Sequence, residues 1–253
     1  YNKIITNISA AERIFDIMDT PSEITDREGA KPLPTVSGEV MFDHVSFAYT
    51  DEPDRLVLHD VSFTAKPGET IALVGPTGAG KTTTMNMMTG YIGATSGTVK
   101  VCGHDIFKEA EEAKKHIGYL PEIPPLYMDM TVWEYLFTVA DLKGVPKSER
   151  KSMIGDVMEK VMITNMKDRL IKNLSKGYKQ RVGIAQTLIG NPDIIILDEP
   201  TSGLDYGHML EVSRRLRELA EQGLCVVVIT HDGEFLRESG AWTADWLPND
   251  KQR

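Results

Sequence analysis

The stretch GPTGAGKT, residues 75–82, directly follows the apolar run IALV and precedes a segment of helical character. Gly75, four further residues and then Gly80, Lys81 and Thr82 make the phosphate-loop pattern. Glycines let such a loop curl so that its N–H groups point at phosphate oxygens. The lysine would contact the β- and γ-phosphates, the threonine hydroxyl would ligate Mg²⁺, and the following helix would add its positive end. The stretch therefore predicts a nucleotide site, the alternative being a Gly-rich turn with a purely structural role.

Two further apolar runs end in polar residues that suit the same chemistry. The run IIILDE ends in Asp198 and Glu199, and VVVIT is followed by His231. Carboxylates at the end of a buried strand cost free energy unless they hold a metal or do chemistry. We expect Asp198 to serve Mg²⁺ through water and Glu199 to be the base that polarises the attacking water. A neutral His231 could hold Glu199 and donate to the γ-phosphate. The alternatives are a strand end that meets solvent and a histidine without a role.

Periodicity predicts an α/β fold. Short apolar strands that alternate with helices favour a parallel sheet covered on both faces. A short helix over residues 9–19 and a linker over 20–38 precede this pattern. Strands are expected over residues 40–49, 57–64, 70–74, 98–101, 194–197 and 226–230. Helices are expected between residues 131 and 190, with Thr131 as a cap, including one over 151–162, and over residues 209–222.

Composition limits the classes of partner. Among 253 residues, 28 are Lys or Arg and 37 are Asp or Glu, a net charge of −9 that disfavours nucleic acid as the main partner. Cys102 and Cys225 have no metal-ligand or redox spacing and are expected to be small buried hydrophobes. The N-terminal residues carry no secretory signal pattern, and the longest apolar runs are too short to cross a bilayer. Any action at a membrane is expected to go through a partner.

Residues 174–181, LSKGYKQR, resemble the signature of ABC (ATP-binding cassette) nucleotide-binding domains, usually LSGGQ followed by a QR pair. With GPTGAGKT, IIILDEP, TSGLD and THD in order, the resemblance covers roughly residues 38–235. It implies a P-loop NTPase fold with a mostly parallel core sheet, a small antiparallel β subdomain and an inserted α-helical subdomain at about 123–190. The predicted domains are residues 1–37, an N-terminal helix and linker, and residues 38–253, the ATPase domain.

The resemblance also assigns roles by position. Tyr49 looks like the aromatic residue that stacks on adenine. Ser175 and Gly177 should bind the γ-phosphate of the ATP held by the opposite subunit, and Asp205 should cross between subunits. The implied ligands are ATP and Mg²⁺, two ATP molecules being held in a head-to-tail dimer. The expected nucleotide contacts are Tyr49, Gly75, Pro76, Thr77, Gly78, Ala79, Gly80, Lys81, Thr82, Thr83, Ser175, Gly177 and Asp205; the expected metal contacts are Thr82, Glu122 and Asp198.

Some residues depart from the family pattern. Glu122 stands where Gln is usual, and it adds a third acid near Asp198 and Glu199, so ATP binding should depend more on Mg²⁺. Lys176 and Tyr178 replace the usual Gly and Gln of the signature and resemble the branch that serves ABC-2-type exporters. Tyr206 stands where Pro is common after SGLD.

The front and the middle of the chain resemble different branches. ISAAERIFDIMDTP with GEVMFDHVSFAY is similar to the segment that precedes the nucleotide domain in fused ABC exporters, but the acidic loop that those carry before the signature is missing. The residues after His231 supply the expected final strand and glycine turn poorly. We hypothesise an engineered chimera with joins near the phosphate loop and near Asp205, the alternative being an unusual natural member.

Three functions fit the sequence to different degrees. The first is an ATPase whose ATP-driven dimer closure drives a transmembrane partner, located in the cytoplasm and held at the membrane by that partner. The alternative is a nucleotide-binding module of chimeric origin with little or no turnover. A non-transport ABC protein of DNA repair or translation is disfavoured by the acidic charge and the exporter-like front.

Overall fold

The computed structural model describes residues 38–76 and 78–245. The helix predicted over 9–19, nearly all of the linker predicted over 20–38, and Thr77 lie outside the described residues. The core is a five-stranded sheet of order β6-β7-β8-β3-β9, and its pairings are all parallel. Its strands are β3 (Thr70–Val74), β6 (Ile117–Leu120), β7 (Ile194–Asp198), β8 (Cys225–Ile229) and β9 (Trp242–Asp245).

Both faces of this sheet are buried, as the apolar strand sequences predicted. Side chains alternate between faces along a strand, so one strand supplies two cores. Ile195 and Leu197 of β7 pack into the core that includes helices α4–α7, whereas Ile194 and Ile196 pack into the core that includes helix α2 and the second sheet. All four are fully buried, and each stabilises the fold by roughly 1.5–3 kcal/mol.

The second sheet is antiparallel and has the order β2-β1-β4-β5. It consists of β1 (Val40–Ala48), β2 (Leu56–Ala65), β4 (Ser96–Val101) and β5 (His104–Asp105). Phe42 pairs with Phe63 across β1 and β2, and their rings stack with centroids 4.7 Å apart. Helix α2 (Lys81–Met88) buries Met85, Met87 and Met88 in the core that this sheet shares with the parallel sheet.

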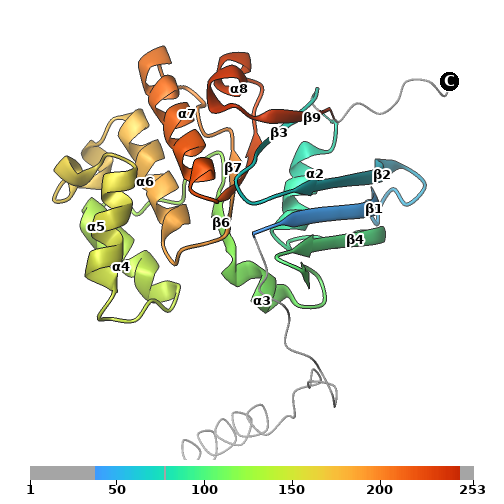
Figure 1. Cartoon of the computed structure of the whole chain (residues 1–253), viewed down its shortest axis with the longest axis horizontal. Helices are drawn as coiled ribbons and strands as arrows, with labels where there is room; N and C mark the ends of the chain where they lie inside the picture. The colour runs from blue at the N-terminus through green and yellow to red at the C-terminus, as the bar shows by residue number, and fades with distance from the viewer. Residues whose placement is uncertain (1–37, 77, 246–253) are drawn as a thin grey trace, which may run out of the picture. The chain divides into compact units, whose positions relative to one another are not determined.

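Three helices form a group on the opposite side of the core sheet from β1, β2 and β4, as Figure 1 shows. They are α4 (Val132–Leu142), α5 (Arg150–Lys160) and α6 (Lys176–Leu188), with short 3-10 turns η1 (Thr164–Met166) and η2 (Ile171–Asn173) between the last two. Thr131 caps α4, as predicted, and forms a complete capping box with Glu134. Lys143 Nζ donates to the carbonyls of Gln186, Thr187 and Ile189, which fixes the C-terminal end of α6 against α4.

The prediction that the chain supplies a final strand and glycine turn poorly is wrong. Helix α8 (Gly233–Ser239) ends at Gly240, which has φ 68°, and β9 then pairs in parallel with β3. An edge strand needs only backbone pairing on one side, so it tolerates a sequence such as WTAD that is not uniformly apolar. The packing of α8 on α7 (Tyr206–Glu221) guides the chain into this position.

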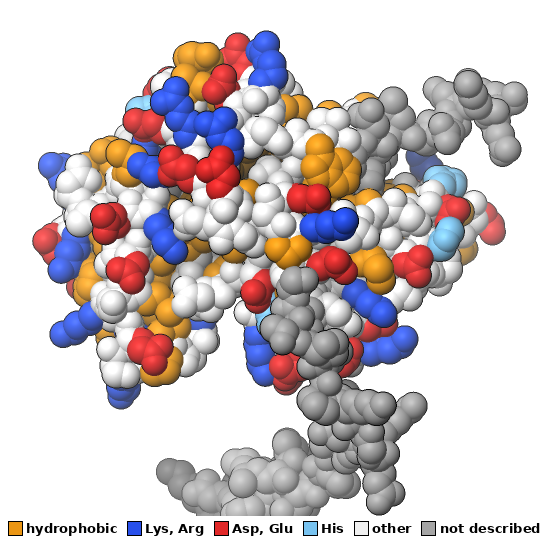
Figure 2. All heavy atoms as spheres, viewed as in Figure 1, with side chains coloured by type: hydrophobic (Ala, Val, Ile, Leu, Met, Phe, Trp, Pro, Cys, Tyr) orange, Lys and Arg blue, Asp and Glu red, His pale blue; other side chains and the backbone are white. Residues whose placement is uncertain are grey.

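The surface over α7 is polar and of mixed charge. Lys, Arg, Asp and Glu side chains are interspersed on the face shown in Figure 2. On α7, Arg215 Nη1 lies 2.5 Å from Glu218 Oε2, one turn away.

Cys102 and Cys225 are buried, as expected. Within residues 38–76 and 78–245, none of the helices combines the length and the apolar character that a bilayer crossing requires. The remaining helix is α3 (Ala110–Lys115).

Candidate functional site

The loop between β3 and α2 has the backbone geometry of an anion cradle. Gly78 has φ 87° and Gly80 has φ 83°, a region that residues with a side chain rarely adopt. A Cβ on Gly80 would lie 2.5 Å from Leu58 Cδ2, so the position has no room for one. Gly80 caps α2 without any side-chain hydrogen bond, so no cap side chain occupies the first N–H groups of the helix. These N–H groups and the helix dipole suit a phosphate.

The lysine of the loop folds back over it. Lys81 Nζ donates to the carbonyl oxygens of Gly75 at 2.5 Å and of Pro76 at 3.0 Å. Ala79 N donates to the same Pro76 oxygen at 3.1 Å, which closes the turn. The ammonium group therefore lies at the mouth of the cradle, where a phosphate oxygen could replace the carbonyls. The expected residues Gly75, Pro76, Gly78, Ala79, Gly80, Lys81, Thr82 and Thr83 all belong to this loop and to the first turn of α2.

The predicted adenine-stacking residue lies beside the same helix. Tyr49 Oη is 3.2 Å from Thr83 Oγ1, although 34 residues separate them in the chain. The Tyr49 ring packs edge-to-face on Phe47, with centroids 4.8 Å apart, and the residue stays 44% exposed. One face of the ring is thus supported, and enough surface remains for a base to stack on it.

Two carboxylates stand at the end of β7, at the same edge of the sheet as the loop. Asp198 is the last residue of β7, and Glu199 has φ 46° and donates its N–H to Ile229 O at 2.8 Å. Burial and, after it, the negative charges of Glu199 and Glu122 together raise the pKa of Asp198 to about 6, against the opposing charge of Lys81. These four side chains therefore share one electrostatic environment.

The candidate base has a hydrogen-bond partner. His231, just beyond β8, lies with Nδ1 2.8 Å from Glu199 Oε1. The hydrogen bond and the charge of Glu199 raise the pKa of His231 above that of a free histidine. The His231 side chain is 84% exposed and that of Glu199 only 17%, so the base is shielded while the histidine faces outward.

A second group of predicted residues gathers around the starts of α6 and α7. Ser175 caps α6 and accepts from Tyr178 N at 3.4 Å, and Asp205 caps α7 and accepts from His208 N at 3.1 Å. A Cβ on Gly177 would lie 3.2 Å from the His208 ring, whose Nδ1 is 2.5 Å from Asp205 Oδ2. No hydrogen bond or ion pair within the described residues joins Ser175, Gly177 or Asp205 to the phosphate loop of the same chain.

Sequence reasoning missed His208. Its ring bonds Asp205, the cap of α7, and lies next to Gly177 in the first turn of α6. A histidine three residues after an acidic N-cap was the available signal, since side chains one turn apart meet on a helix. The contact across to α6 required the tertiary structure.

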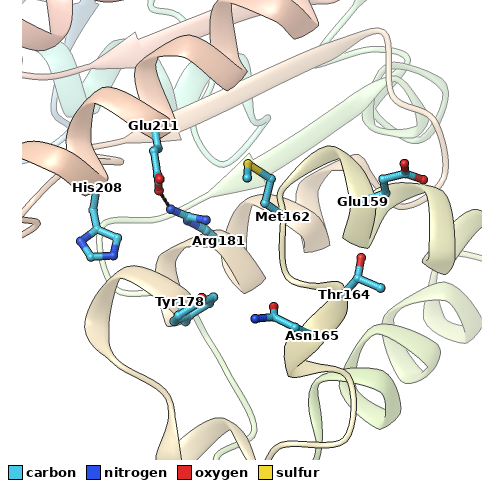
Figure 3. Close-up of a pocket in the computed structure, with 8 residues that line it drawn as sticks. All are labelled: Glu159, Met162, Thr164, Asn165, Tyr178, Arg181, His208 and Glu211. Atoms are coloured by element: carbon cyan, nitrogen blue, oxygen red, sulfur yellow. Dashed lines mark ion pairs between the residues drawn. The ribbon is translucent and has the colours of Figure 1, made fainter.

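A pocket of about 510 Å³ lies beside this second group rather than over Lys81. Figure 3 shows it between α5, η1, α6 and α7, with Tyr178 and Asn165 at one side and an ion pair between Arg181 and Glu211 at the other. His208 also lines it. The pocket therefore adjoins α6, which carries most of residues 174–181 and is called the signature helix below, and it is separate from the phosphate loop.

Comparisons with known proteins agree with this arrangement. Residues 58–202 match the family described as ABC transporter. The uncharacterized ABC transporter ATP-binding protein YhcH of Bacillus subtilis (strain 168) is 41% identical over 179 residues, which are 70% of this chain and 57% of that protein. ATP-binding cassette sub-family B member 6 of Homo sapiens is 34% identical over 235 residues, 90% of this chain and 27% of that one. The chain thus spans 57% of the length of the first relative and 27% of the length of the second.

A solved structure shares the fold. Structurally, cbiO1 from Clostridium perfringens, part of the ABC transporter complex cbiONQ, superposes with a TM-score of 0.71 and 27% identity over 78% of this chain and 79% of that chain. The matched region contains the phosphate loop, the signature helix and the acidic end of β7. With more than half of its length matched, the chain belongs to the ABC transporter family as an ATP-binding domain.

Proposed function

We propose that this chain binds MgATP and hydrolyses ATP to ADP and phosphate, as one half of a head-to-tail dimer that drives a transmembrane partner. ABC ATPase domains generally bind ATP with Mg²⁺ and hydrolyse it. The observation that carries the proposal for this chain is the shielded carboxylate of Glu199, bonded to His231 and placed in the same electrostatic environment as Lys81. A base, an orienting partner and a phosphate cradle are the parts that the reaction needs.

In the proposed mechanism the residues mainly position ATP and the attacking water and polarise that water. The N–H groups of the loop and Lys81 would hold the β- and γ-phosphates, and Tyr49 would hold the base. Glu199 would accept a hydrogen bond from the attacking water, which places the water in line with the γ-phosphate. His231 would fix Glu199 and offer a donor to the phosphate oxygens.

The residues present fit a magnesium ion. Thr82, Asp198 and Glu122 would supply hydroxyl and carboxylate oxygens, which Mg²⁺ prefers. Burial and, after it, the negative charges of Glu199 and Glu122 raise the pKa of Asp198, and a divalent cation would offset those charges. When bound, the ion would neutralise charge that develops on the phosphate oxygens.

The dimer is proposed from the second group of residues. Ser175, at the start of α6, is exposed and Gly177 is buried, and neither has a bond to the phosphate loop of its own chain. A second chain in head-to-tail arrangement would bring them onto the ATP held at Lys81. We also keep the domain limits that the sequence suggested as part of this proposal. Residues 38–253 would form the ATPase domain, with a helical subdomain at about 123–190. We place the domain at the cytoplasmic side of a membrane, through its partner.

The test is the rate of phosphate release with MgATP for the parent protein and for Glu199→Gln. General-base catalysis contributes about 10²- to 10⁴-fold, so the variant should be at least about 100-fold slower. The matched control is Glu112→Gln, which removes an exposed carboxylate on α3 and should leave the rate unchanged. A parent protein without turnover, or a Glu199→Gln variant as fast as the parent, would contradict the proposal.

A further inference from the structure

Three potential metal ligands converge away from the nucleotide site. The ligand atoms of Cys102, His116 and Asp193 all lie within 4.8 Å of one another. They come from separate segments: Cys102 follows β4, His116 caps the end of α3, and Asp193 directly precedes β7. Their spacing in the sequence, 14 and 77 residues, matches no metal-binding motif, so only the fold brings them together.

The backbone holds these residues in place. Asp193 N and Ile194 N both donate to His116 O at 3.0 Å, and His116 Nδ1 lies 2.6 Å from Asp193 Oδ2. Cys102 has φ 51°, and its N–H donates to Glu39 O at 2.7 Å. A positive φ is uncommon for a residue other than glycine, and this backbone conformation fixes the direction of the Cα–Cβ bond that carries the thiol.

A fourth potential ligand lies beside the three. The ring of His104 stacks on that of His116, with centroids 5.9 Å apart and planes within 15°. Nδ1 of His104 is buried and makes no hydrogen bond, and Glu109 Oε1 lies 3.5 Å away, at ion-pair distance. A buried polar atom without a hydrogen bond costs about 1–3 kcal/mol, and a bound cation would use the lone pair of this nitrogen.

We propose that Cys102, His116 and Asp193 bind a Zn²⁺ ion, with His104 as the fourth ligand after a rotation of its side chain. One sulfur, imidazole nitrogen and a carboxylate oxygen suit Zn²⁺, whereas Mg²⁺ and Ca²⁺ take oxygen ligands. With ligand bonds of about 2.0–2.3 Å, a tetrahedral site separates neighbouring donors by about 3.3–3.5 Å. The His116–Asp193 contact would therefore open by less than about 1 Å.

The site has access and a structural consequence. The side chains of His116 and Asp193 are 31% and 45% exposed, which gives an ion a path from solvent, while Cys102 closes the inner side. The ion would join the hairpin of β4 and β5 in the antiparallel sheet to the ends of α3 and β7 at the core sheet.

The test uses the full chain, stripped of metal with a chelator. We expect calorimetric titration with Zn²⁺ to give one ion per chain, and Co²⁺ in its place to give the near-ultraviolet absorption of a thiolate–cobalt bond. Cys102→Ser should remove that absorption, and His116→Ala and Asp193→Asn should weaken Zn²⁺ binding by about 100-fold. His104→Ala should weaken it by about tenfold; unchanged binding in that variant would refute the fourth ligand.

The matched control is His44→Ala, since His44 Nδ1 also lies 2.7 Å from a carboxylate, that of Asp60, in an exposed pair. This variant should bind Zn²⁺ as the parent does. MgATP binding, measured in parallel, should persist in every variant, which separates a failure here from a failure of the proposed ATPase. Absence of stoichiometric Zn²⁺ binding, or a parent–Co²⁺ spectrum without thiolate absorption, would overturn the proposal even if a cysteine variant failed to fold.

Discussion

His231→Ala removes the hydrogen bond between His231 Nδ1 and Glu199 Oε1, which is 2.8 Å long. In the single chain the histidine side chain is 84% exposed, and an exposed ion pair contributes only about 0–1 kcal/mol. A head-to-tail dimer that excludes water from the site would strengthen the same bond to about 1.5–3 kcal/mol, as for hydrogen bonds to charged groups. The loss should therefore fall on turnover, at about 10- to 150-fold in kcat, and not on folding.

The assay is phosphate release at saturating MgATP, together with urea unfolding of the nucleotide-free chain. We expect kcat to fall by at least about tenfold while the free energy of unfolding changes by less than about 1 kcal/mol. His44→Ala is the control, because it removes another histidine–carboxylate pair with an exposed histidine, far from the loop in sequence. The reasoning is refuted if kcat changes less than about threefold, or if the unfolding free energy falls as much as the activation free energy rises.

Three further variants test single structural features. Thr131→Ala removes the capping box of α4, in which Thr131 Oγ1 accepts a hydrogen bond from Glu134 N at 3.2 Å. The variant should lower the free energy of unfolding in urea by about 1 kcal/mol without changing MgATP affinity. A variant as stable as the parent would contradict this prediction. Gly80→Ala forces a side chain into φ 83° and should weaken MgATP binding in a calorimetric titration; parent-like affinity would contradict it. Glu122→Gln removes one of the charges that raise the pKa of Asp198 to about 6, so an NMR titration should show that pKa shifted down and the Mg²⁺ dependence of ATP affinity reduced; an unchanged pKa and Mg²⁺ ratio would end this idea. Because the folded-state pKa is raised, the protonated form of Asp198 favours folding at low pH, and this contribution is lost as the pH rises from about 4 to 6; the loss should be smaller in Glu122→Gln.

The parts of the site that lie on contiguous motifs could be predicted from the sequence. The loop from Gly75 to Thr82 and the acids after β7 are local patterns whose chemistry depends on neighbouring residues. Strand and helix positions followed from periodicity, because an apolar strand buried on both faces has few alternatives. Thr131 could be predicted as a cap because a threonine directly before a helical run is a local signal, whereas its capping box with Glu134 was seen only in the structure.

The parts that depend on tertiary contacts could not be predicted. His208 meets the signature helix only after α6 and α7 pack, and Cys102, His116 and Asp193 converge from three segments. The strand β9 was missed because edge strands are selected by backbone pairing more than by side-chain pattern. The raised pKa of His231 likewise depends on its contact with Glu199, which spacing in the sequence does not encode.

The central claim is that the loop around Lys81 grips the triphosphate of a nucleotide, and the most direct measurement is the MgATP affinity of Lys81→Ala by calorimetric titration. Lys108→Ala, which removes an exposed lysine paired with Asp105, is the control. Loss of a charged hydrogen-bond donor of about 1.5–3 kcal/mol predicts affinity about 10- to 150-fold weaker in Lys81→Ala and unchanged in the control. MgATP bound by Lys81→Ala as tightly as by the parent would contradict the account.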